Sequence, residues 1–279
     1  MRGHNTNTAG ACGTDPLLSE EKREPAELSA RARALRLLRQ AGIPFVVGGA
    51  YAYAHYTGLH RDTKDLDLFL RNEDADRAIV LFEEAGWRTE RDTHGWLHKA
   101  FCGDFLVDLI FSAGNRIVQV DDAWVKHGEE GVVLGERCFI SPVEEIIWSK
   151  AFVQERDRFD GAELNHLLLA TGARLDWERL LQRFDRYWEV LLAHLLFFRF
   201  AYPSDRETIP AWIMWGLLSK AFDSVRGGNW SGKLCRGRLL SEPGYRPDVE
   251  EQGYEDGLAW DEQERARTKT PPEPSPRKH

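Results

Sequence analysis

Three aspartates occur at spacings that suit a metal-dependent reaction on phosphate groups. Asp65 and Asp67 lie two residues apart in an alternating polar and apolar segment, so both side chains should leave the same face of a strand. Asp108 interrupts the apolar run from Phe105 to Phe111, where a carboxylate is costly unless it is paired or binds a cation. Carboxylates held close together repel each other, and Mg²⁺ prefers such oxygen ligands. If the two segments are neighbouring strands, the three aspartates can hold two metal ions.

Each of these residues also has an ordinary structural explanation. An Asp-x-Asp pair on a half-exposed strand usually belongs to a solvated face, and Asp108 could pair with a buried arginine or cap a turn. The metal-site interpretation is favoured by the combination, because the three carboxylates follow a strand, a glycine pair and a helix in that order along the chain.

The glycine pair is Gly48-Gly49, between an apolar run at 43–47 and a predicted helix over 50–56. Glycine adopts positive φ and allows a ligand to approach the backbone closely. A helix N-terminus offers free N–H groups and a partial positive charge, which suit a phosphate. The pair therefore predicts a phosphate-binding turn, and the alternative is an ordinary tight turn between strand and helix.

This order of motifs resembles the DNA polymerase β superfamily of nucleotidyltransferases. Members carry a Gly-Gly or Gly-Ser turn after the first strand, an Asp-x-Asp on the next strand and a third acidic residue on a later strand. The matching residues here are Gly48, Gly49, Asp65, Asp67 and Asp108. The resemblance covers residues 43–111 and, more loosely, 140–170, and it extends to small bacterial members of the antibiotic and toxin–antitoxin types.

The resemblance implies transfer of a nucleoside monophosphate from a nucleoside triphosphate to an acceptor hydroxyl, with two Mg²⁺ ions. By that analogy Asp65 and Asp67 bind both metals, while Asp108 binds the catalytic metal and helps to deprotonate the acceptor. Gly48 and Gly49 would hold the triphosphate. Many relatives have serine where this chain has Gly49, so one hydroxyl that could contact phosphate is missing here.

Four more residues are predicted to bind the nucleotide or to support the site. Arg61 and Thr63 immediately precede the aspartate pair and could contact phosphate or order the loop. Lys150 stands in a predicted helix where related enzymes often place a basic residue toward the nucleotide, and Asp160 follows it ten residues later. The alternative for such charged residues is a solvated loop or a surface ion pair.

The pattern of segments predicts an α+β fold: a mixed, nucleotidyltransferase-type sheet flanked by helices, followed by a helical C-terminal half. We expect a disordered leader over 1–15, a catalytic domain over 16–140, a helical subdomain over 141–226, and an extended tail over 227–279 that is largely disordered after 260. Trp212, Trp215 and Leu218 are predicted to pack against the apolar helix over 188–201. The predicted helices cover 25–41, 50–56, 74–86, 143–158, 162–171, 176–184, 188–201 and 211–225. The predicted strands cover 43–47, 64–70, 87–91, 96–102 and 105–111, with further short strands within 117–134.

The overall charge restricts the classes of partner. A net charge of -8 and a pI of about 5.7 argue against broad nucleic-acid binding and favour a small-molecule or protein acceptor. The four cysteines form no CxxC pair, no apolar run approaches a membrane span, and the first residues lack an apolar signal core, so we expect a cytoplasmic protein.

Two other functions remain open at this point. A nucleotidyltransferase fold can serve as a non-catalytic nucleotide-binding or antitoxin-like regulatory module. A metal-dependent phosphohydrolase would need a water nucleophile and usually more histidine ligands than this chain offers in motif spacing.

Overall fold

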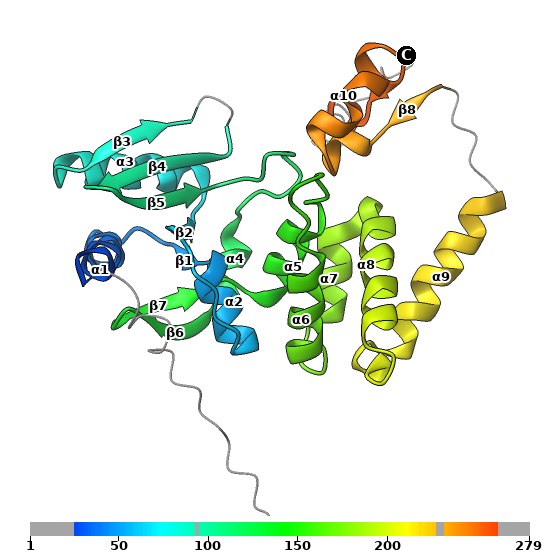
Figure 1. The fold of residues 1–279 in the computed structure, drawn as a ribbon, viewed down its shortest axis with the longest axis horizontal. Helices are drawn as coiled ribbons and strands as arrows, with labels where there is room; N and C mark the ends of the chain where they lie inside the picture. Colours follow the sequence, from blue (N-terminus) through cyan, green and yellow to red (C-terminus); the bar gives the residue numbers. More distant parts are fainter. Residues whose placement is uncertain (1–24, 93–94, 227–231, 262–279) are drawn as a thin grey trace, which may run out of the picture.

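The computed structural model describes residues 25–92, 95–226 and 232–261. The predicted leader and the chain after residue 261 lie outside these ranges. Figure 1 shows a sheet at one side of the molecule and a stack of helices beside it, with the C-terminal segment above the helices. None of the helices in the described ranges is long and apolar enough to cross a membrane.

In the described residues seven strands form one mixed sheet, in the order β3-β4-β5-β2-β1-β7-β6. The strand pairs β2–β5 and β1–β7 are parallel, and the other neighbours are antiparallel. The strands are β1 (Val46–Val47), β2 (Asp65–Phe69), β3 (Arg88–Arg91), β4 (Leu97–Cys102), β5 (Phe105–Ile110), β6 (Glu129–Val133) and β7 (Glu136–Ile140).

The centre of the sheet follows from the alternation in the sequence. In β2, Leu66 and Leu68 are fully buried, whereas Asp65 and Asp67, which alternate with them, point to the other face and are partly exposed. In β5, Val107 and Leu109 repeat the same pattern beside them. One face of each strand therefore joins the hydrophobic core, and the other face presents carboxylates.

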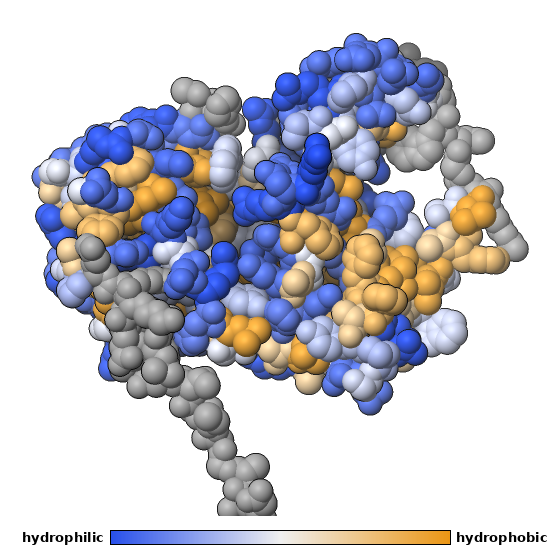
Figure 2. Space-filling model, in the orientation of Figure 1, coloured by the Kyte–Doolittle hydropathy of each residue, from blue (hydrophilic) through white to orange (hydrophobic). Residues whose placement is uncertain are grey.

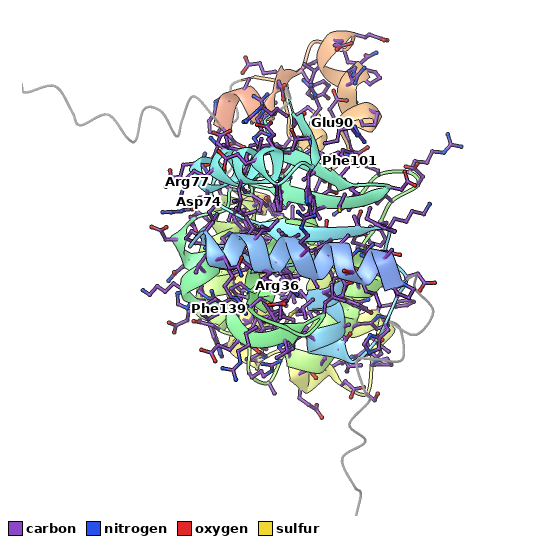
Figure 3. All side chains as sticks on the ribbon, turned by 90° about the vertical axis from the view of Figure 1, so that its left-hand side faces the viewer. Arg36, Asp74, Arg77, Glu90, Phe101 and Phe139 are labelled. Carbon is purple, nitrogen blue, oxygen red and sulfur yellow. The ribbon has the colours of Figure 1, made fainter. Side chains whose placement is uncertain are left out.

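Helices cover the sheet and then form a layer of their own. The helices are α1 (Pro25–Gln40), α2 (Gly49–Thr57), α3 (Asn72–Glu84), α4 (Asp122–Lys126), α5 (Val143–Ala151), α6 (Gly161–Thr171), α7 (Trp177–Phe184), α8 (Trp188–Ala201), α9 (Ala211–Arg226) and α10 (Glu242–Glu250). Helices α1 and α3 pack on the sheet, and α6 packs against α2, α5 and α8. Figure 3 shows α1 lying across the sheet, with Arg36 on the side toward β7. Both Arg36 and Arg39 bind Glu136 at the start of that strand, at 2.8 and 2.9 Å.

Buried carboxylates at the start of α5 connect the helical half to the rest of the chain. The side chain of Glu145 is fully buried and accepts hydrogen bonds of 3.1 Å from Arg179 and Arg183 of α7. Arg179 also pairs with Glu144, and Arg183 donates to Asp121, which caps the N-terminus of α4, at 2.7 Å. Three helices are thus held together by one network of charges.

Three of the helices differ from the sequence prediction. Helix α5 ends at Ala151 rather than continuing to residue 158, and the chain then forms a tight loop closed by a bridge between Gln154 and Phe159. The stretch predicted to hold only strands contains α4, which is N-capped by the Asp121 carboxylate. Trp212 and Trp215 are more than half exposed, and α9 packs on α8 through other residues.

The stretch predicted as an extended tail is structured between residues 232 and 261. It contains two short strands, β8 (Leu234–Cys235) and β9 (Glu255–Asp256), and the helix α10. Its end is fixed by Asp261, whose buried carboxylate accepts a hydrogen bond of 2.8 Å from the Tyr187 hydroxyl and pairs with Arg186 and Arg236 at 3.2 and 3.3 Å. A buried acid with three partners anchors this segment to the helical layer.

Candidate active site

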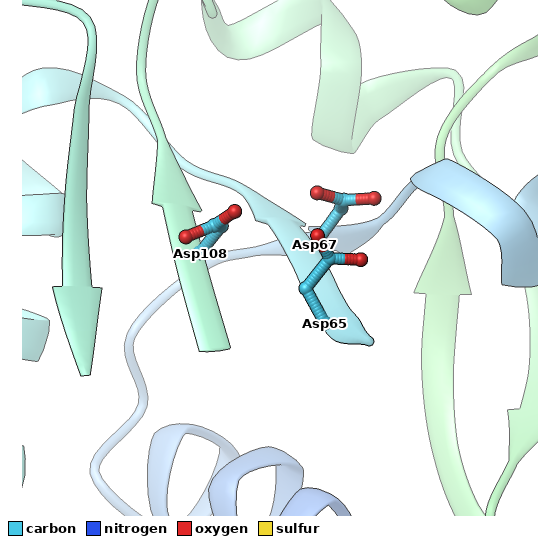
Figure 4. Close-up of side chains that lie close together, drawn as sticks. All are labelled: Asp65, Asp67 and Asp108. Carbon is cyan, nitrogen blue, oxygen red and sulfur yellow. The ribbon is translucent and has the colours of Figure 1, made fainter. Parts of the chain in front are cut away.

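The three aspartates meet on one face of the sheet. Strands β2 and β5 are parallel neighbours, and their register places Asp67 directly beside Asp108. Asp65 lies two residues before Asp67, on the same face. One carboxylate oxygen from each residue lies within 4.8 Å of the other two, which suits a shared cation (Figure 4). The proximity expected from the sequence is therefore present.

Burial and mutual repulsion make this group of carboxylates electrostatically unfavourable. Burial, reinforced by the neighbouring Asp65 and Asp108, raises the pKa of Asp67 to about 7. Burial and Asp65 likewise raise the pKa of Asp108 to about 6. The Oδ1 atom of Asp108 is buried and has no hydrogen-bond partner among the described residues. A hard divalent cation would supply the positive charge and the missing partner, so the donor set fits such an ion.

The glycine turn is shaped by this site. Gly49 has a φ of +53°, and a Cβ atom placed on it would lie 1.7 Å from an Asp67 carboxylate oxygen. A Cβ atom on Gly48 would lie 2.1 Å from the ring of Phe69. Both positions therefore exclude larger residues, and the absence of side chains brings the first turn of α2 against the aspartates.

Two cations, Lys150 and Arg61, pair with the same carboxylate beside this region. The Lys150 ammonium lies 2.8 Å from Asp160 and 2.7 Å from Glu163, and Arg61 lies 3.2 Å from the other oxygen of Glu163. Both cations contribute to lowering the pKa of Asp67. Glu163 was missed by the sequence reasoning. Its only signal is its place three residues after Asp160, on the exposed start of a predicted helix.

Thr63 has a different place from the other predicted residues. Its hydroxyl donates to the Asp65 carboxylate at 2.5 Å, and its carbonyl accepts from the buried Arg31 at 3.2 Å. Thr63 orients one aspartate instead of lining the cavity described next, whose walls include Gly49, Arg61 and Asp67.

A cavity of about 390 Å³ opens beside the aspartates. The sheet, α5 with its following loop, and the C-terminal segment all contribute to its lining. The lining includes Asp67, Trp96, Lys150, Asp160, Arg238 and Leu258. The C-terminal segment is held there by two hydrogen bonds. The Asn115 side chain donates to the carbonyl of Leu239 at 3.1 Å, and the backbone N–H of Gln154 donates to the carbonyl of Leu240 at 3.1 Å.

A mixed sheet with three converging carboxylates, a glycine turn and a helical second half defines a nucleotidyltransferase-type protein. The comparison with known families agrees, because the family described as "Nucleotidyl transferase of unknown function (DUF2204)" matches residues 27–190. These residues include the three aspartates and the glycine turn. The chain belongs to this family, and the predicted enzyme class is confirmed.

Solved structures of nucleotidyltransferases also resemble the chain. The antibiotic-resistance factor ANT(2'')-Ia is 21% identical, with a TM-score of 0.44 over 62% of this chain and 98% of its own. The lincosamide antibiotic adenylyltransferase LnuA, in a lincomycin-bound structure, is 13% identical, with a TM-score of 0.37 over 52% of this chain and 96% of its own. A nucleotidyltransferase structure from Thermotoga maritima is 15% identical, with a TM-score of 0.34 over 43% of this chain and 80% of its own. No curated protein matches the chain. At these values the similarities support no inference about the substrate.

Proposed function

We propose that this protein transfers a nucleoside monophosphate from a nucleoside triphosphate to a hydroxyl group of an acceptor, with Mg²⁺ as its cofactor. The observation that carries this proposal is the parallel register of Asp67 and Asp108, with Asp65 on the same face. The raised pKa values of Asp67 and Asp108 and the unpartnered Asp108 oxygen are the features expected of a carboxylate set that binds cations.

Asp65 and Asp67 would hold two Mg²⁺ ions, with Asp108 as a further ligand of one of them. When bound, the ions offset the negative charge of the phosphates and of the attacking oxygen. Asp108 would also accept the proton of the acceptor hydroxyl, because its carboxylate lies within 4.8 Å of the other two and its Oδ1 atom has no hydrogen-bond partner among the described residues.

The remaining predicted residues would bind the triphosphate. The backbone N–H groups at Gly48-Gly49 begin α2 and can donate to phosphate oxygens. Lys150 and Arg61, which face the cavity from two elements, would neutralise the phosphates, while Asp160 fixes the Lys150 ammonium. Thr63 would hold the Asp65 carboxylate in place for the metal.

The cavity and the charge of the chain indicate the class of acceptor. The lining contains both aromatic and aliphatic side chains and charged ones, which suits a hydroxylated small molecule or an exposed protein side chain. A net charge of -8 speaks against a long nucleic acid. We place the reaction in the cytoplasm.

The test is a transfer assay on the full chain. Labelled ATP, GTP, CTP and UTP are incubated with Mg²⁺ and a panel of hydroxylated acceptors, and pyrophosphate and the mass of the acceptor are measured. We expect pyrophosphate together with an acceptor heavier by one nucleoside monophosphate. Asp67→Asn should lower the rate by about a hundredfold or more, whereas the exposed turn variant Asp104→Asn should not.

Two other outcomes would reject the proposal. Tight nucleotide binding without pyrophosphate for any acceptor would indicate a regulatory module. Release of inorganic phosphate without a modified acceptor would indicate a hydrolase.

A further inference from the structure

The helical half of the molecule exposes a large apolar surface at its outer side. Eight large apolar side chains on α8 and α9 are between 42% and 86% exposed, and we call this surface the α8–α9 face. Its residues are Leu196, Phe197, Phe200, Trp212, Trp215, Leu218, Phe222 and Val225. Figure 2 shows apolar side chains gathered over these two helices, below the mostly hydrophilic surface of the C-terminal segment.

Helix α9 is apolar on two sides. Ile213, Met214 and Leu217 are buried where α9 packs on α8. The residues of the α8–α9 face that belong to α9 recur three or four positions apart from Trp212 to Val225, so they form a second stripe along the helix. A helix with two apolar stripes is suited to a position between two packed neighbours, and within the described residues α9 packs mainly on α8 alone.

The size of the face matches one side of a stable protein interface. Five of its eight residues are aromatic, and at their exposed fractions these five side chains alone present roughly 500–800 Å². The largest apolar patch on a typical monomer is roughly 300–600 Å². A standard interface buries about 800 Å² on each partner.

The sequence outside the described ranges holds little that could cover this face. Residues 262–279 and 93–94 contain no large apolar side chain, residues 1–24 contain only Met1, Leu17 and Leu18, and residues 227–231 contain only Trp230. A net charge of -8 also disfavours adsorption to an anionic membrane surface. These four side chains are fewer than the eight of the α8–α9 face, so we take the occupant to be another protein surface with matching apolar area.

The shape of α9 favours a second copy of the same chain. A two-fold interface needs projections and recesses on the same surface, because each patch meets itself. On α9 the indole of Trp215, 73% exposed, projects next to Gly216, where a Cβ atom would meet nothing within 4 Å. The small Ser219 follows one turn later and is also exposed.

We propose that the protein forms a two-fold symmetric dimer through the α8–α9 face, with α9 of one protomer packed across α9 of its partner. The cavity beside the aspartates is lined by no residue of α8 or α9, so this dimer leaves it open. The inference is independent of the proposed transfer reaction.

The experiment measures the molar mass of the full chain in solution by light scattering after size-exclusion chromatography. We expect twice the chain mass of 32.0 kDa. The double variant Trp215→Glu/Phe200→Asp should raise the dissociation constant of the dimer by about a hundredfold or more and elute as a monomer. Val132→Asp, a matched change at an apolar residue of β6 that is 67% exposed, should remain a dimer.

A measurement on the unmodified protein does not depend on how the variants fold. Amide hydrogen exchange across 211–226 should speed up when the protein is diluted below the dissociation constant, while exchange in β2 and β5 stays constant. A wild type that is monomeric at every concentration, a dimer that survives the double variant in its folded state, or exchange in α9 that ignores dilution would each overturn the proposal.

Discussion

Replacing Asp67 by asparagine should stabilise the metal-free protein while it removes the activity. In the folded chain the pKa of this carboxyl is raised from 3.8 to about 7, mainly by burial and then by its acidic neighbours. The folded state therefore binds the proton more tightly than the unfolded state does. Stability that is present below the unfolded pKa is lost as the pH rises through the interval from 3.8 to about 7.

The difference between these two pKa values sets the size of the effect. It corresponds to at most about 4 kcal/mol of folding free energy lost by pH 8, because each pKa unit is worth about 1.4 kcal/mol. Asp67→Asn removes the charge and should recover a large part of this loss. For a chain of this size we expect an increase in Tm of roughly 5–10 °C at about pH 8, a smaller increase at about pH 5, where only the unfolded carboxyl has ionised, and almost none at about pH 3, where the carboxyl is protonated in both states.

The assay is thermal unfolding in the presence of a chelator, repeated across that range of pH. The exposed Asp104→Asn variant serves as the control and should follow the wild type. Added Mg²⁺ should raise the Tm of the wild type and leave that of Asp67→Asn almost unchanged. A variant whose Tm runs parallel to the wild type at every pH would refute the reasoning, because the carboxylate would then carry no folding penalty.

Three further predictions concern neighbouring features. Gly49→Ala should destabilise the fold and abolish transfer, because its Cβ atom would overlap the Asp67 carboxylate. Gly42→Ala has a similar positive φ but open space around it, so it should lower the free energy of unfolding by only about 1 kcal/mol. Urea unfolding and the transfer assay check this. Lys150→Met should weaken nucleoside triphosphate binding by about ten- to a hundredfold in calorimetry, and exposed Lys126→Met should not. Glu145→Ala should lower the free energy of unfolding by about 3–5 kcal/mol, because it removes the fully buried carboxylate that Arg179 and Arg183 share; a loss below about 1 kcal/mol in urea would contradict this.

The sequence predicts those parts of the molecule whose signals are local. Alternating leucines and aspartates predict β2, and the apolar run broken by Asp108 predicts β5, because the side chains of a strand alternate between its two faces. The sequence alone does not say that these two strands are neighbours, and the structure shows that they pair in parallel. The fold class is confirmed for the same reason.

The parts that the sequence did not predict depend on contacts between distant residues. Helix α5 was extended too far because residues 152–158 are not poor helix formers, and the contact that redirects them is a hydrogen bond from Gln154 to Leu240, far along the chain. In the sequence Glu163 resembles any polar residue at a helix start, and only the folded structure shows that Arg61 and Lys150 both pair with it. Helical spacing gave α9 an apolar stripe but did not say which of its two stripes faces α8.

Under the proposed function, the segment from 232 to 261 would separate the reacting groups from the selection of substrates. The carboxylates and the glycine turn lie within the residues shared with the family, 27–190, whereas Arg238, Leu240 and Leu258 reach the cavity from beyond them. Sequence changes in this later stretch can alter which molecules fit without disturbing the reacting groups. Related chains that keep the same aspartates but differ after residue 232 should therefore differ in acceptor range before they differ in mechanism.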